Sequence, residues 1–240
     1  LKGGTYNIDK PIEILYGDNG SSAKMLTVQA ENNEKVVIDC QKKTAGVILG
    51  GDYWHFKNIE FTNSADNQKC FHLGGSHNII ENCTFSNNGD MGLQISRISG
   101  KDQPDFEQWP SYNLILNCET YNNCDPSMIN ADGFGAKLTV GTGNVFRNCK
   151  SHHNVDDGWD LYTKVSTGAI GAVTLENCES YRNGWRLNED GTETPYNAGG
   201  NNGFKCGGEN VAVQHQLINC KAWGNGNNGI TTNSNPALKL

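Results

Sequence analysis

The chain has 240 residues, a formal net charge of −7 and a sequence pI near 5.3. This balance argues against a nucleic-acid-binding protein, because no stripe of Lys and Arg is available to displace counterions from phosphates. No run of about 18 apolar residues predicts a membrane span. The 29 glycines predict many tight turns, and the composition marks no boundary between two domains. We predict a single domain over residues 1–240, truncated at both ends.

An Asn-Cys dipeptide recurs along the chain and predicts its architecture. The copies begin at residues 82, 117, 148, 177 and 219, so the spacings are 35, 31, 29 and 42 residues. Unequal spacing around a constant local pattern predicts repeated coils joined by loops of variable length. The nine cysteines are odd in number and five share this repeat position, so we predict buried free thiols rather than disulfides.

Short apolar segments with near-alternating patterns precede these dipeptides. They include residues 77–81, 113–116 and 172–176, which are rich in β-branched side chains and predict strands. The sequence has no persuasive helical stripe, and the turn signals of hairpin-rich sandwiches are weak. Short strands repeated in this way predict an all-β fold, a β-solenoid in which each coil buries its inner face against its neighbours.

A column of asparagines follows the dipeptides, five residues after each cysteine. Its members, with Ser64 in an earlier and weaker copy, are Asn88, Asn123, Asn154, Asn183 and Asn225. Asparagine tolerates left-handed backbone, and its amide can bridge identical side chains in the coils above and below. We predict an asparagine ladder with a structural role.

A second column begins with a glycine and an apolar residue in each copy. The period-two alternation of a strand points the next residues outward, namely Gln94, Gly135, Asp160, Lys205 and Thr231. The residues before each glycine place Asp132 and Asp157 on consecutive coils, about 4.8 Å apart. Asp156 and Asp160 belong to the same stretch as Asp157, so four carboxylates should converge on one patch.

Four converging carboxylates predict a calcium site. Their mutual repulsion raises pKa values and destabilises the fold unless a cation intervenes. Calcium accepts about 6 to 8 oxygen ligands with forgiving geometry, whereas zinc prefers His or Cys, and neither residue falls in the aligned cluster. His152 and His153 precede it, and a minor role for them stays open.

Lys205 lies one coil beyond Asp160 in the outward column. A surface ion pair with Asp160 is the simplest interpretation and would contribute little. Beside calcium, a lysine has a more specific use: it could remove the C5 proton of a uronic acid whose carboxylate the metal neutralises, with loss of the C4 oxygen. Calcium should then lower the pKa of Lys205 from about 10.4 and favour alkaline activity.

Three segments resemble family 9 of the polysaccharide lyases, the pectate-lyase-like β-helix enzymes. They are Asn-Ala-Asp-Gly-Phe at residues 130–134, Asn-Val-Asp-Asp-Gly-Trp-Asp-Leu-Tyr at 154–162 and Asn-Gly-Phe-Lys at 202–205. The resemblance, which runs from about Asn58 to Thr231, implies a right-handed parallel β-helix with an asparagine ladder. It implies a calcium ion held by four aspartates, and a lysine base. Carried over by position, these are Asp132, Asp156, Asp157, Asp160 and Lys205.

The resemblance also implies a polyuronate partner, by default pectic galacturonan, and secretion, because a cell-wall polymer is too large to enter a cell intact. We expect a monomer. Loops at residues 101–111 and 186–200 should flank the cleft. Their aromatic residues would pack in the loops or, less often, stack on sugars: Trp109, Trp185 and Tyr196. Further uronates could pair with cations that otherwise are ordinary solvated charges: Arg97, Lys137, Arg182 and Arg186.

Three alternatives stay open at this point. Related enzymes act on rhamnogalacturonan I, and the loops do not decide between the polymers. A metal-free hydrolase of the polygalacturonase type could use Asp156 and Asp157, but its expected Gly-His-Gly and Arg-x-Lys segments are absent from the sequence. A non-catalytic carbohydrate-binding solenoid would use calcium structurally, and Lys205 would then be dispensable.

Overall fold

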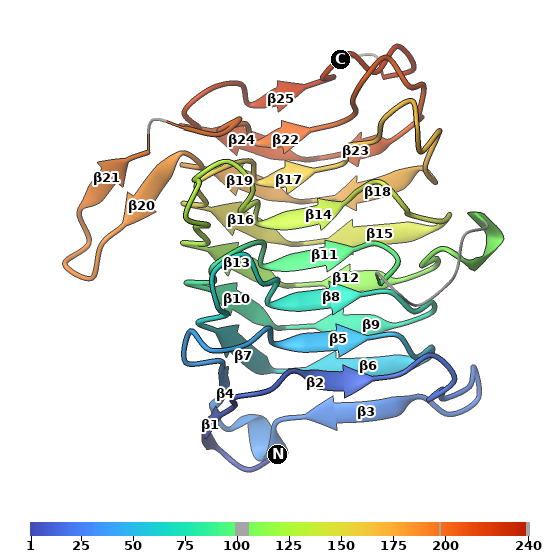
Figure 1. Ribbon diagram of the computed structural model, residues 1–240, viewed down its shortest axis with the longest axis vertical. Coiled ribbons are helices and arrows are strands. Elements are labelled where there is room, and N and C mark those ends of the chain that lie inside the picture. The colour runs from blue at the N-terminus through green and yellow to red at the C-terminus, as the bar shows by residue number, and fades with distance from the viewer. Residues whose placement is uncertain (99–105, 197, 239–240) are drawn as a thin grey trace.

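The computed structural model describes residues 1–98, 106–196 and 198–238, which form a parallel β-helix (Figure 1). The first of its three sheets contains β1 (Gly4–Asn7), β4 (Val36–Asp39), β7 (Ile59–Thr62), β10 (Thr84–Ser86), β13 (Glu119–Tyr121), β16 (Lys150–His152), β19 (Glu179–Tyr181) and β24 (Lys221–Trp223). Each strand pairs in parallel with the equivalent strand of the next coil. The predicted solenoid is confirmed.

Two further parallel sheets complete each coil. The second sheet contains β2 (Ile12–Ile14), β5 (Val47–Leu49), β8 (Phe71–Leu73), β11 (Leu93–Ile95), β14 (Phe134–Ala136), β17 (Trp159–Asp160), β22 (Phe204–Lys205) and β25 (Ile230–Thr231). The third contains β3 (Leu26–Gln29), β6 (Trp54–Lys57), β9 (Ile79–Glu81), β12 (Leu114–Leu116), β15 (Asn144–Arg147), β18 (Val173–Glu176) and β23 (Gln216–Ile218). The predicted strand segments 77–81, 113–116 and 172–176 contain β9, β12 and β18.

Two kinds of element depart from the coils. Short 3-10 turns occur at η1 (Glu31–Asn33) and η2 (Phe106–Gln108). An antiparallel hairpin of β20 (Trp185–Leu187) and β21 (Glu193–Pro195) extends from one side of the β-helix (Figure 1). Within the described ranges, no helix is long and apolar enough to cross a membrane.

The core is a column of apolar side chains inside the coils. Phe134, Trp159 and Phe204 follow the recurrent glycines and are fully buried. The Trp159 ring is tilted against Phe134 and stacked on Phe204, with ring centroids 5.0 and 4.9 Å apart, respectively. Such aromatic contacts add to the burial of apolar surface. The prediction that this column points inward is therefore confirmed, and the residue after each ring points outward, toward solvent or the site.

The repeated cysteines pack as small apolar residues. All nine thiols are free, and the column position is buried in Cys83, Cys118, Cys149 and Cys178. Their sulfurs donate weakly to backbone carbonyls of the preceding coil, as from Cys118 Sγ to Ile80 O at 3.4 Å. This confirms the free-thiol prediction.

The asparagine ladder forms as predicted. The Nδ2 group of each member donates to Oδ1 of the next, at 2.8 Å from Asn88 to Asn123 and 3.0 Å from Asn154 to Asn183. Sequence reasoning missed a second, exposed ladder made by the asparagines of the Asn-Cys dipeptides, such as Asn148 Nδ2 to Asn117 Oδ1 at 3.1 Å. These residues have positive φ, 55° at Asn148, which asparagine tolerates better than most residues.

The two ladders should differ sharply in their contribution to stability. Asn154→Ala is expected to cost about 1–3 kcal/mol of unfolding free energy for each buried group left unpaired, here the backbone N–H and one Nδ2 hydrogen of Asn123. Asn148→Gly, which removes an exposed ladder amide and keeps the left-handed backbone, should cost less than about 1 kcal/mol. Urea denaturation of both variants checks this, and equal losses would contradict a stabilising inner ladder.

Candidate functional site

The outward column of the second sheet brings Asp160 and Lys205 together. In register, Gln94 pairs with Gly135, Gly135 with Asp160, Asp160 with Lys205, and Lys205 with Thr231. The alignment made from the sequence is therefore the register of the sheet. Asp160 is 3 % exposed, and the Lys205 side chain is 21 % exposed. Lys205 thus offers the more accessible group.

The column before the glycines forms a ladder of its own, with carboxylates in place of two amides. The backbone N–H of Asp157 donates to Asp132 Oδ1 at 3.1 Å. Asn202 donates to Asp157 Oδ1 from its backbone N–H and from Nδ2, both at 2.8 Å. These bonds orient both carboxylates through one oxygen each. The other oxygen of Asp157, Oδ2, is buried and accepts no hydrogen bond within the described residues, and its charged neighbour is Lys205, with Nζ 3.1 Å away.

Three of the predicted metal ligands form a compact group. Asp132, Asp156 and Asp157 are buried, and each offers an oxygen within 4.8 Å of the other two. The backbone N–H of Gly200 donates to Asp156 Oδ1 and fixes that side chain. Three buried carboxylates that converge with oxygen atoms as their only ligands match the preference of calcium. The residues present therefore fit the ion.

Asp160 lies outside this group of three and pairs with two lysines instead. Its Oδ2 is 2.8 Å from Lys137 Nζ, and its Oδ1 is 3.5 Å from Lys205 Nζ. Lys137 also pairs with Asp132 Oδ2 at 2.8 Å, and Lys205 with Asp157 Oδ2 at 3.1 Å. Five charged groups thus alternate in sign along one chain of contacts, which runs from Asp132 through the two lysines and Asp160 to Asp157.

Lys137 is the site residue whose place sequence reasoning missed. The sequence predicts it only as a contact for a more distant uronate. The alternation that points Gly135 outward also points Lys137 outward, so the signal was present in the sequence. With both lysines counted, the four aspartates and two ammonium groups sum to −2, a charge that one divalent cation would neutralise.

Burial and repulsion shift the ionisation of the carboxylates. Burial, and next the repulsion from the neighbouring Asp157, raise the pKa of Asp156 to about 7. Burial also raises the pKa of Asp132 and of Asp157. For Asp160, burial opposes ionisation, but Lys137 and Lys205 outweigh it and hold the pKa below its usual value.

Lys205 is held in its charged form by the same carboxylates. Burial acts to lower its pKa, but attraction to Asp160 and Asp157 outweighs burial and raises the pKa above 10.5. The lowered pKa expected from the sequence therefore requires that a cation first offset the carboxylates. The Nζ group also lies 5.7 Å from the centroid of the Tyr162 ring, over its face.

His152 and His153 lie elsewhere. Their Nδ1 atoms are 2.7 Å apart, and their Nε2 atoms contact Glu119 at 3.2 Å and Glu193 at 2.9 Å, respectively. His152 also stacks between aromatic rings on the outer face of the first sheet. Neither belongs to the group of metal-ligand carboxylates.

The predicted cleft loops differ from one another. Residues 101–105 lie outside the described residues. Trp109 is 7 % exposed and packs on Phe106, with ring centroids 5.3 Å apart. Arg182 covers the Trp185 ring at 4.5 Å and pairs with Glu193. Trp109, Trp185 and Arg182, the candidate sugar and uronate contacts, therefore pack against neighbouring side chains of the protein.

Comparison with known proteins shows the family. The family model described as "Pel9A-like, right handed beta helix region" matches residues 1–239. "Pectate lyase L" of Thermoclostridium stercorarium is 49 % identical over 99 % of this chain and 19 % of its own length. "Pectate lyase L" of Paenibacillus polymyxa (strain SC2) is 44 % identical over 98 % of this chain and 52 % of its own.

A solved structure agrees with these matches. The crystal structure of pectate lyase Pel9A superimposes with a TM-score of 0.79 at 32 % identity, covering 98 % of this chain and 56 % of that one. This chain therefore spans about half, or less, of the length of these relatives. Family match, fold and residue columns agree throughout. The chain belongs to the Pel9A-like right-handed β-helix family, polysaccharide lyase family 9.

Proposed function

We propose that this chain is the catalytic β-helix of a calcium-dependent pectate lyase that cleaves pectic galacturonan by β-elimination. The observation that carries the proposal is the buried group Asp132, Asp156 and Asp157 beside a partly exposed Lys205 on the neighbouring coil. Two relatives named as pectate lyases support the reaction. Because the substrate is a large wall polymer, we propose an extracellular location.

The metal would be held by Asp132, Asp156 and Asp157, with Asp160 at its edge. When bound, calcium would neutralise a uronate carboxylate and so acidify the adjacent C5 proton. A weakly acidic carbon requires this help because the carbanionic charge must be delocalised. The ladder bonds to Asp132 and Asp157 keep the carboxylates in place during turnover.

Lys205 would act as the base. Its Nζ takes the C5 proton, the C–H electron pair forms the C4–C5 double bond, and the C4–O bond breaks to release the next sugar. Lys205 must be neutral before this step, so the charge of the nearby carboxylates has to be offset first. Asp160 stays ionised between the two lysines and positions Lys205 Nζ, while Lys137 joins Asp160 to Asp132.

The test is the ultraviolet absorbance of the unsaturated uronide during incubation with polygalacturonate or rhamnogalacturonan I. We expect a rise with polygalacturonate and calcium that a chelator abolishes. A rise with rhamnogalacturonan I alone would replace the substrate in this proposal. No rise in absorbance with either polymer, from protein with a β-rich circular dichroism spectrum, would contradict the proposed lyase activity and favour a non-catalytic binding solenoid.

A further inference from the structure

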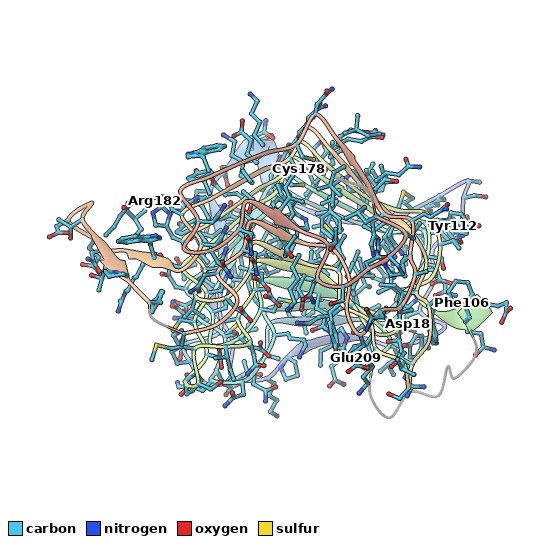
Figure 2. The ribbon with its side chains drawn as sticks, turned by 90° about the horizontal axis from the view of Figure 1, so that it is seen from above. Asp18, Phe106, Tyr112, Cys178, Arg182 and Glu209 are labelled. Atoms are coloured by element: carbon cyan, nitrogen blue, oxygen red, sulfur yellow. The ribbon has the colours of Figure 1, made fainter. Side chains whose placement is uncertain are left out.

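A cavity of about 670 Å³ lies between the β20–β21 hairpin and the turns that leave the first sheet. The β-helix contributes Asn63, Asn87 and Asn122, each directly after a strand of consecutive coils. None of the four aspartates, Lys137 or Lys205 lines it. Figure 2 shows the hairpin standing out from one side of the β-helix, with Arg182 near its base. The cavity is therefore distinct from the aspartate-lysine site.

The hairpin is fastened to the coils, so this cavity has fixed walls. Asn122 Nδ2 donates to Leu187 O at 2.8 Å, and the Leu187 N–H donates to Asn122 Oδ1 at 2.9 Å. These paired bonds join residues 65 positions apart. They hold the outer wall, which includes Arg186 and Tyr196, over the turns of the lower coils.

The charge of the lining is positive in a protein of net charge −7. Lys42 and Arg186 both line the cavity and are exposed, and Glu189 is the acidic residue among the lining side chains. Arg186 forms no ion pair with any residue that the structure describes. Lys42 Nζ donates to the backbone carbonyl of Asn87, a neutral partner. Asp66 and Asp39 attract Lys42 from a distance, but among the described residues neither cation has a carboxylate within ion-pair distance, and this favours an anionic ligand.

An aromatic surface is available beside these cations. Tyr121 stacks on His152 with ring centroids 5.2 Å apart and planes 3° from parallel. On the opposite side, the strand register pairs Tyr121 with Ser86, which has no ring. The aromatic stack of the first sheet thus ends where Tyr121 lines the cavity. A flat amphipathic ring next to amides and cations suits a sugar ring that carries a carboxylate.

We propose that this cavity is a second binding site, for an acidic oligosaccharide segment of the uronate polymer. A sugar ring would pack on Tyr121, its carboxylate would pair with Lys42 and Arg186, and hydroxyls would meet the amides of Asn63 and Asn87. The uronate identity of the ligand rests on the proposed lyase function. The loop that forms the outer wall continues to Gly200, which bonds to Asp156, so one loop serves both sites.

Cys124 provides a probe of occupancy. It lines the cavity and is partly exposed, as is Cys220, which lies outside it. With a chelator present to prevent turnover, tetragalacturonate at ten times its dissociation constant should slow maleimide labelling of Cys124 by about tenfold. Labelling of Cys220, resolved by peptide mass spectrometry, should keep its rate. Equal labelling of Cys124 with and without saturating tetragalacturonate would overturn the site.

Matched variants separate this site from the lyase. Arg186→Gln and Lys42→Gln should each weaken the protection of Cys124, whereas Lys150→Gln, an exposed lysine outside the cavity, should leave it unchanged. Equal protection by neutral cellotetraose would overturn the charge argument. Calcium-dependent cleavage by native protein without protection of Cys124 overturns only this inference. Protection of Cys124 by native protein that does not cleave the polymer would overturn the proposed lyase activity and support the second binding site.

Discussion

Lys205→Met should lower the rate of polygalacturonate cleavage by about 10²- to 10⁴-fold, the usual contribution of a positioned general base. The side chain lies at the accessible edge of the carboxylates, with Nζ 3.1 Å from Asp157 Oδ2. Methionine fills similar space without a proton acceptor. The initial rate of ultraviolet absorbance increase at saturating calcium measures the effect.

Two further variants distinguish the role of Lys205 as a proton acceptor from the effect of its positive charge. Lys205→Arg keeps the cation beside Asp157 and Asp160, but a guanidinium with a pKa above about 12 is a poor base, so this variant should also be slow. Lys150→Met, on the first sheet, should keep the native rate. If Lys205→Met retained turnover within tenfold of native, another group would have to remove the proton.

Calcium should strongly increase the unfolding free energy of the native chain, but it should hardly change that of the Asp157→Asn variant. At 100 times its dissociation constant, a ligand of the folded state adds about 2.7 kcal/mol to the free energy of unfolding. Asparagine at position 157 can still accept the two bonds from Asn202, because Asn202 holds the equivalent ladder position on the next coil. The substitution thus removes a ligand charge while it keeps the ladder. Thermal unfolding with calcium or chelator compares the two.

The pH dependence of the chelated protein provides an independent check. Asp156 has a pKa of about 7 in the folded chain and about 3.9 when unfolded. Because the folded pKa is the higher one, protonated Asp156 contributes to the free energy of unfolding. This contribution is fully present below the unfolded pKa and is lost as the pH rises through about 7. The Tm of chelated native protein should therefore fall more steeply from pH 4 to 7 than that of Asp156→Asn. Parallel profiles for the two proteins would contradict a strained carboxylate group.

Calcium should flatten the native profile over the same range. The ion binds the ionised carboxylates and so stabilises the form that repulsion disfavours. Its apparent affinity should fall as the solution becomes more acidic, since protons compete for Asp156. Isothermal calorimetry at pH 6 and pH 8 measures this, and a tighter site at pH 6 would be incompatible with carboxylate ligands.

The aspartate-lysine columns could be predicted from the sequence because they depend on local regularities. A strand alternates its side chains with period two, and a solenoid stacks equivalent positions of successive coils. The alignment on Asn-Cys therefore placed Asp132 with Asp157 and Asp160 with Lys205, as the strand register confirms. Glycines and asparagines recur at fixed turn positions, so the inner ladder followed from the same alignment.

Other features depended on directions that repeats do not specify. Lys137 pairs with both Asp132 and Asp160. Asp160 is thereby engaged by a lysine and lies outside the group of three carboxylates that could hold a metal. The hairpin after β19 folds back on Asn122, 65 residues earlier, and creates a cavity that no periodic pattern marks. By itself, the sequence determined which residues share a column, because backbone periodicity is local. Only the tertiary structure decided how long side chains pair and where the loops return, because those depend on contacts between distant segments.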